Sequence, residues 1–89
     1  MIERRVQVVN KLGLHARAAA KLVQAASVHS AKIFLEKDGQ EVNGKSIMGV
    51  MMLAASQGTE LTLRADGEDE EQAMETLVQL IAARFGEPE

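Results

Sequence analysis

The sequence predicts an α+β fold: an open-faced β-sandwich in which a four-stranded antiparallel sheet is covered on one face by three helices. Four segments alternate between apolar and polar residues, which is typical of strands with one buried face. Three other segments repeat apolar residues at spacings of three and four, which is typical of amphipathic helices. Strands with a single apolar face need a cover on that face only, and the helices supply it.

The strands are expected over Ile2–Val9, Ala31–Lys37, Gln40–Asn43 and Glu60–Ala65. The dipeptide Asp38-Gly39 is a strong signal for a two-residue hairpin between the second and third strands. One residue breaks the alternation, because Arg4 falls among the apolar positions of the first strand. Its place near the strand end allows it to stay hydrated.

The helices are expected over Ala16–Ala26, Ile47–Ala54 and from the residue after Asp69 to about Arg84. Asp69 is the predicted N-cap of the last helix, and the acidic run Glu68–Glu71 is interpreted as a helix start and not as a cation site. The apolar stripe of this helix consists of Met74, Leu77, Val78, Ile81 and Phe85. The element order is therefore strand, helix, strand, strand, helix, strand, helix.

Composition narrows the class of protein. A chain of 89 residues with 46% hydrophobic content is expected to form one domain, residues 1–89. The absence of cysteine excludes disulfides and thiolate metal sites, and no metal or cofactor is expected. A net charge of −3 and only two aromatic residues argue against nucleic-acid binding. Without a signal-peptide core or an apolar run of about 20 residues, we expect a cytoplasmic protein that does not insert into membranes.

A histidine stands immediately before the first helix, in the stretch Asn10–Arg17. The first backbone N–H groups of a helix lack partners and carry a partial positive charge, so His15 is expected to stay neutral and nucleophilic there. The N–H groups of Ala16 and Arg17, with the Arg17 guanidinium, can hold an anion beside it. His15 is therefore interpreted as a phosphoryl acceptor. On spacing alone, a surface or capping histidine is an equal alternative. The other histidine, His29, lies in a polar loop and is expected to be solvated.

The second helix begins with Ser46, a favourable N-cap residue. About two helical turns cannot bury all of the apolar side chains that this helix carries, so some must be exposed. Val50 and Leu53 are expected to face the core. An exposed methionine-rich patch beside His15 suits docking to several partners. The predicted surface is formed by Ile47, Met48 and Met51, with Ala20, Lys21 and Gln24 of the first helix at its rim.

Two motifs carry a family resemblance that covers essentially the whole chain. Gly13-Leu14-His15-Ala16-Arg17 resembles the active-site signature of the HPr phosphocarriers of the bacterial phosphoenolpyruvate-dependent sugar phosphotransferase system. Gly44-Lys45-Ser46-Ile47-Met48-Gly49-Val50-Met51 resembles the second signature of that family. The order of elements is similar to the βαββαβα fold of the family.

The resemblance implies that His15 takes a phosphoryl group on Nδ1 from phosphorylated enzyme I and passes it to a histidine of an enzyme IIA. Arg17 would steady the phosphate, and the protein would be a carrier without turnover of its own, expected to be a monomer. Ser46 would be a regulatory site for HPr kinase/phosphorylase. One position departs from the pattern, because Ala18 replaces the usual proline, and only a small effect on the helix start is expected.

Two alternatives remain open. Asn10-Lys11-Leu12-Gly13 also resembles the nitrogen-related branch of the family, whose carriers regulate rather than transport. A non-catalytic regulator that acts through Ser46 and the methionine patch is the other. The presence of His15 argues against that alternative, because members reduced to this role can lose the histidine.

Overall fold

The computed structural model describes the whole chain, residues 1–89. In chain order the elements are β1 (Ile2–Gln7), α1 (Ala16–Ser27), β2 (Lys32–Lys37), β3 (Gln40–Asn43), α2 (Ile47–Met52), β4 (Glu60–Asp66), α3 (Glu70–Ala82) and a short 3₁₀ turn, η1 (Arg84–Gly86). The predicted α+β fold, with a sheet covered on one face by three helices, is confirmed. None of the helices has the length and apolar character that crossing a membrane requires.

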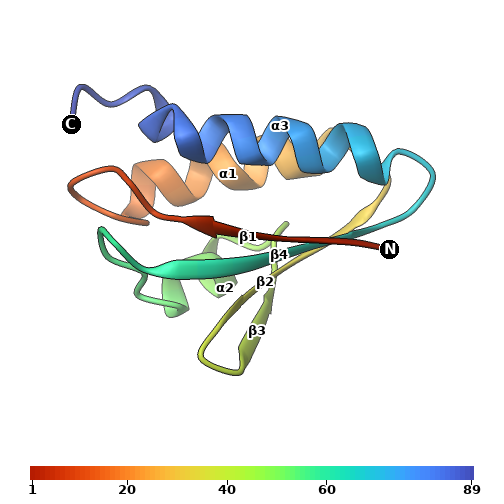
Figure 1. Cartoon of the computed structure of the whole chain (residues 1–89), viewed down its shortest axis with the longest axis horizontal. Helices are drawn as coiled ribbons and strands as arrows, with labels where there is room; N and C mark the ends of the chain where they lie inside the picture. The colour runs from red at the N-terminus through yellow and green to blue at the C-terminus, as the bar shows by residue number, and fades with distance from the viewer.

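The sheet has the strand order β1-β4-β2-β3, and every neighbouring pair is antiparallel. Its register aligns Ile33 with Ala65 and Leu35 with Leu63. All four side chains are buried, because residues paired across a ladder point to the same face. Helices α1 and α3 lie side by side across that face (Figure 1).

The core is one cluster of 20 buried apolar residues to which all three helices contribute. Leu22 of α1, Val50 of α2 and Leu77 of α3 are each at most 1% exposed. The core contains a single aromatic residue, Phe85, because the other one, Phe34, lies half-buried at an outward position of β2. The helices therefore pack on the sheet mainly through aliphatic side chains.

The opposite face of the sheet is held together by one arginine. Arg64 of β4 forms ion pairs with Glu36 of β2 at 2.7 Å, Glu3 of β1 at 2.9 Å and Glu41 of β3 at 2.9 Å. The hydrogen bonds to Glu36 and Glu3 raise the pKa of the Arg64 guanidinium further above its usual range. A single side chain thus links all four strands on the uncovered face.

Three elements end earlier than the sequence predicts. Strand β1 ends at Gln7. Helix α2 ends at Met52, because Ala54 adopts a left-handed φ of +50°. Helix α3 stops at Ala82, after which Arg84 and Phe85 have φ values of +59° and +55°. This turn still buries Phe85 in the core, as expected, and directs the last residues towards the start of α1 (Figure 1).

At the start of α3 the predicted N-cap position of Asp69 is confirmed, but its side chain does not cap the helix, and the prediction for His29 is wrong. Asp69 stands at the N-cap position but makes no capping hydrogen bond with its side chain. Its carboxylate instead accepts hydrogen bonds from the N–H groups of Ser30 and Ala31, at 3.1 and 2.9 Å. His29 is not solvated: its side chain is 10% exposed, and Nδ1 lies 3.0 Å from Asp69 Oδ2. The α1–β2 loop contains donors that satisfy Asp69 more fully than the helix start does.

Candidate functional site

His15 is the N-cap residue of α1. Its backbone is extended, with φ −73° and ψ 177°, and its carbonyl accepts the N–H of Ala19 at 2.8 Å. Its ring caps the helix, because Nδ1 accepts a hydrogen bond from the backbone N–H of Arg17 at 3.3 Å. An unprotonated ring nitrogen therefore lies over the first amides of the helix, as the sequence predicts for a phosphoryl acceptor.

The loop before α1 is tightly anchored and fixes the place of His15. Gly13 has a φ of +68°, and a Cβ atom there would lie 2.4 Å from the carbonyl oxygen of Ala55. The next residue, Leu14, is 5% exposed and donates its N–H to the same carbonyl at 2.9 Å. Only glycine fits this close approach of two loops, and the buried leucine holds the following histidine at the surface.

An open hollow of about 720 Å³ lies against His15. The side chain of His15 is 29% exposed, so it can be reached from solvent. The lining residues come from the loop before α1, its first turn and the end of the chain, namely Lys11, Leu12, His15, Ala16, Arg17, Glu87, Pro88 and Glu89. The structure thus brings the predicted residues Ala16 and Arg17 together with His15 and leaves both exposed.

Glu87 is the main feature of the site that the sequence did not reveal. Its Oε2 contacts Nε2 of His15, and its Oε1 accepts a hydrogen bond from Asn10 Nδ2 at 3.0 Å. The hydrogen bonds from Asn10 and then from His15 lower the pKa of the Glu87 carboxyl. Glu87 lies 72 positions after His15, so only the turn that follows α3 brings the two side chains together.

The second signature places its residues as expected. Ser46 is the N-cap of α2, and its Oγ accepts the N–H of Gly49 at 3.1 Å. Val50 and Leu53 are buried. The exposed fractions of Ile47, Met48 and Met51 are 44%, 73% and 42%. Helices α1 and α2 are in contact, so an exposed apolar surface borders α1.

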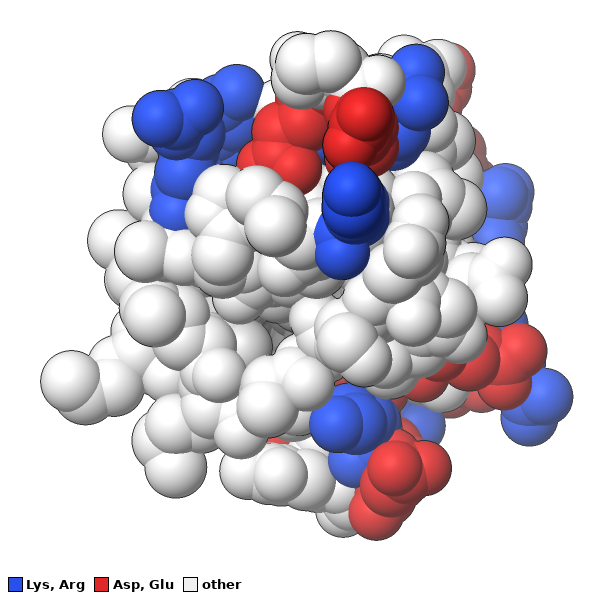
Figure 2. Space-filling view, turned by 90° about the vertical axis from the view of Figure 1, so that its left-hand side faces the viewer, with Lys and Arg blue, Asp and Glu red and all other residues white.

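The predicted rim on α1 is only partly free. Gln24 is exposed and Ala20 is half-buried. Lys21 is half-buried, and its Nζ donates to the carbonyl oxygen of Phe85 at 2.7 Å. Figure 2 views the end of the molecule where α1 begins and the chain ends. Charged side chains gather at the top of this view, and uncharged ones cover a broad area below them.

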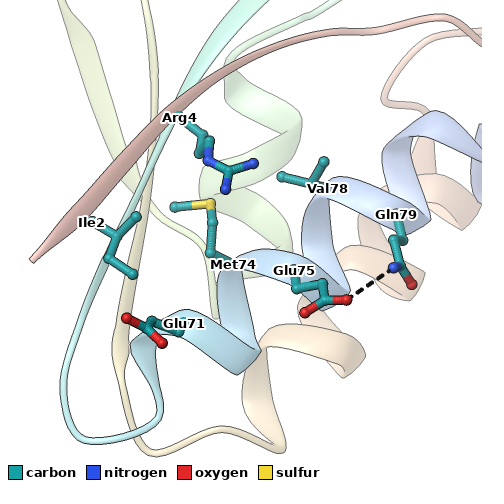
Figure 3. A pocket seen from close by; sticks show the side chains of 7 residues that line it. All are labelled: Ile2, Arg4, Glu71, Met74, Glu75, Val78 and Gln79. Carbon is teal, nitrogen blue, oxygen red and sulfur yellow. Dashed lines mark hydrogen bonds between the residues drawn. The ribbon is translucent and has the colours of Figure 1, made fainter.

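A second hollow, of about 530 Å³, lies between β1 and α3 and contains none of the predicted site residues. Figure 3 shows the side chain of Arg4 extending over Met74 towards the helix. This placement explains the break in the alternation of β1, because the hollow leaves the guanidinium in contact with water. Glu75 at its edge is hydrogen-bonded to Gln79 at 3.2 Å.

Comparisons with known proteins identify the family of the chain. Residues 2–83 match the family described as "PTS HPr component phosphorylation site". The phosphocarrier protein HPr of Cupriavidus necator is 53% identical over 89 residues, with both chains fully covered. The HPr-like protein Crh of Bacillus subtilis is 56% identical over 77 residues, which are 86% of this chain and 91% of that protein. The crystal structure of HPr-C-His from Thermoanaerobacter tengcongensis has a TM-score of 0.96 at 52% identity, with both chains fully covered. The chain therefore belongs to the HPr family of phosphocarriers of the phosphotransferase system.

Proposed function

We propose that His15 is the residue that carries the phosphoryl group, on Nδ1, between phosphorylated enzyme I and a histidine of an enzyme IIA in sugar uptake. The observation that carries this proposal is the hydrogen bond from the Arg17 N–H to Nδ1 of His15, at 3.3 Å. A nitrogen that accepts a hydrogen bond has its lone pair available. It is therefore the nitrogen able to attack phosphorus.

The start of α1 supplies what a bound phosphoryl group needs. The N–H groups of Ala16 and Arg17 belong to the first turn, where backbone donors lack intrahelical acceptors. The exposed Arg17 lines the same hollow and can bring its guanidinium to the phosphoryl oxygens. Stabilisation of charge by such fixed donors is the main protein contribution to phosphoryl transfer. The protein then acts as a cytoplasmic carrier that needs no cofactor and turns over only with its partners.

Phosphorylation in vitro tests the assignment. The protein is incubated with phosphoenolpyruvate and enzyme I, and ³¹P NMR identifies the phosphorylated ring nitrogen. We expect acid-labile phosphate on Nδ1 of His15 and none on the His15→Ala variant. His29 offers a matched control, because it is the only other histidine and is paired with Asp69. Phosphate that persists on His15→Ala, or that disappears from His29→Gln, would exclude the proposal.

The partner surface is proposed to be formed by Ile47, Met48 and Met51, with Ala20, Lys21 and Gln24 at its rim. The exposure of the three α2 side chains supports it, because soft apolar side chains adapt to several partners. Met48→Asp should weaken binding of enzyme I and enzyme IIA, measured by titration calorimetry, and leave the fold intact. Met52→Asp is the control, since Met52 is 65% exposed on the same helix but lies outside the proposed surface. Unchanged affinity of Met48→Asp would refute the surface.

Ser46 is proposed as a regulatory phosphorylation site for HPr kinase/phosphorylase. Its N-cap position supports this, since a phosphate is tolerated at a helix start and would place negative charge beside the partner surface. We expect slower transfer from enzyme I after modification. Incubation with the kinase and ATP, followed by mass spectrometry, decides the matter: an unmodified Ser46 would end the claim.

The nitrogen-related branch remains an alternative for the Asn10–Gly13 stretch. The enzyme I that charges His15, sugar type or nitrogen type, separates the two branches. A regulator without phosphoryl transfer is the other alternative. Loss of regulatory binding on Ser46→Ala, together with no phosphate on His15, would support that alternative. Monomeric behaviour stays a prediction, which sedimentation velocity can check.

A further inference from the structure

A network of polar contacts links Asn10 and Glu87 to the ring of His15. Asn10 lies in the loop after β1 and is fully buried. Its Nδ2 donates to the carbonyl oxygen of Gly13 at 2.8 Å and to Glu87 Oε1 at 3.0 Å. Glu87 in turn contacts Nε2 of His15 through Oε2. Two parts of the chain that are distant in sequence, the loop before α1 and the last residues, thus converge on the ring edge opposite Nδ1.

The orientation of the Asn10 amide is fixed by its partners. Both of them, the Gly13 carbonyl and the Glu87 carboxylate, only accept hydrogen bonds, so the NH₂ group must face them. The price is a buried Asn10 Oδ1 without any hydrogen-bond partner. A buried oxygen without a hydrogen-bond partner is energetically costly, so its presence indicates that the two hydrogen bonds of the Asn10 NH₂ group are functionally important.

The carboxylate determines where the proton of the imidazole lies. An ionised carboxylate has no proton to donate, so its contact with Nε2 requires that Nε2 carry the ring proton. Nδ1 is then the unprotonated nitrogen, in agreement with the hydrogen bond that it accepts from Arg17. The two ring nitrogens report the same tautomer through independent partners. We propose that Glu87, held by Asn10, is a positioning residue that fixes His15 in the Nε2–H tautomer and thereby leaves Nδ1 free to accept the phosphoryl group.

This inference rests on the proposed function and completes its charge balance. The lone pair of Nδ1 forms the new P–N bond while the P–N bond of the donor protein's phosphohistidine breaks and returns its electron pair to the donor ring. The proton on Nε2 stays on His15, so the ring becomes positively charged as the bond forms. Glu87 lies against that proton and stabilises the developing charge. The other charged groups of the hollow are Lys11, Arg17 and Glu89, and Lys21 acts on Glu87 from α1.

Glutamine at position 87 provides a sharp test because it keeps the shape and changes one acceptor into a donor. Asn10 would engage the Gln carbonyl, so the Gln NH₂ group would face Nε2 of His15. That donor favours a ring protonated on Nδ1, where the phosphoryl group should be bound. We expect ¹⁵N NMR of histidine-labelled Glu87→Gln to move towards the Nδ1–H tautomer, and Glu87→Ala to give a mixture of both tautomers.

Kinetics of phosphorylation by phosphoenolpyruvate and enzyme I provide the second measurement. Loss of a charge-assisted hydrogen bond should lower kcat/KM of Glu87→Gln roughly ten- to a hundredfold, with a smaller decrease for Glu87→Ala. Glu68→Gln is the matched control, because Glu68 is exposed just before the start of α3. It lines neither the hollow beside His15 nor the hollow between β1 and α3. Circular dichroism verifies that each variant is folded.

The two measurements separate the two claims. A slow Glu87→Gln with an unchanged ¹⁵N spectrum would overturn the positioning role, because Glu87 would then act on docking. A Glu87→Gln variant with the spectrum and rate of the unaltered protein would overturn it as well. A tautomer shift in a protein that enzyme I never phosphorylates would support the positioning role and remove the proposed function.

Discussion

Truncation of Phe85 should reveal how strongly the end of the chain is anchored. Phe85 is 1% exposed and is the only aromatic side chain in the core. Removing a buried phenyl ring loses its transfer free energy and leaves a cavity, which together cost about 3–5 kcal/mol. A domain of this size has a total stability of about 5–15 kcal/mol, so Phe85→Ala should use up a large part of it.

Urea unfolding followed by far-UV circular dichroism measures the effect, since the chain has no Trp or Tyr for fluorescence. Phe34→Ala is the matched control, because the same side chain is removed from a half-buried position on the uncovered face of the sheet. We expect this control to lose only about 1 kcal/mol. Equal losses for the two variants, or a loss below about 1 kcal/mol for Phe85→Ala, would refute the view that Phe85 anchors the last residues.

Three further predictions concern the loops and the helix start. Burial raises the pKa of Asp69, but the hydrogen bonds from Ala31 and Ser30 outweigh it and hold the pKa at about 2, against an ordinary value of 3.8. A carboxylate whose pKa is lower in the folded protein stabilises the fold at pH values above the pKa that it has in the unfolded chain. In urea titrations, the difference in free energy of unfolding between the protein and Asp69→Asn should therefore vanish as the pH falls from 3.8 through about 2. A difference that stays constant with pH would contradict this. Gly13→Ala should lower the free energy of unfolding by at least about 1–2 kcal/mol, because the left-handed φ is unfavourable for alanine and the new Cβ atom would clash with the Ala55 carbonyl oxygen. Gly39→Ala is the control, since a Cβ atom there would have no neighbour within 4 Å, and its free energy of unfolding should decrease less in the same assay. Ala18→Pro should leave the rate of His15 phosphorylation within a few-fold, because the first turn of a helix tolerates proline, and a change by orders of magnitude would show that the Ala18 N–H takes part.

Periodicity and cap chemistry were enough to predict the fold class and the placement of most elements. Leu61 and Leu63 are buried while Thr62 and Arg64 face outward, because alternation in a strand is a local property of the chain. The same holds for Ser46, whose capping bond reaches only three residues ahead. Local rules therefore succeed wherever the partner is close in sequence.

The side-chain contacts that the sequence did not reveal share the opposite feature. Asp69 is the N-cap residue of α3 as predicted, but the partners of its side chain lie 38 to 40 positions earlier in the α1–β2 loop. Glu87 was overlooked because its partners, His15 and Asn10, are 72 and 77 positions away. The turn that places Glu87 beside them depends on two consecutive non-glycine residues with left-handed φ values, Arg84 and Phe85. No residue pattern in the sequence predicts such a turn. Tertiary packing decided these contacts.

The folding back of the last residues has a practical consequence for anyone who attaches a label to this molecule. Glu89 is joined to the loop before α1, where its carbonyl oxygen accepts the N–H of Lys11 at 2.8 Å. Any fusion or fluorophore added after it would sit at the mouth of the hollow that partners must enter. The first residue lies at the far end of the molecule (Figure 1), so labels for transfer assays belong there.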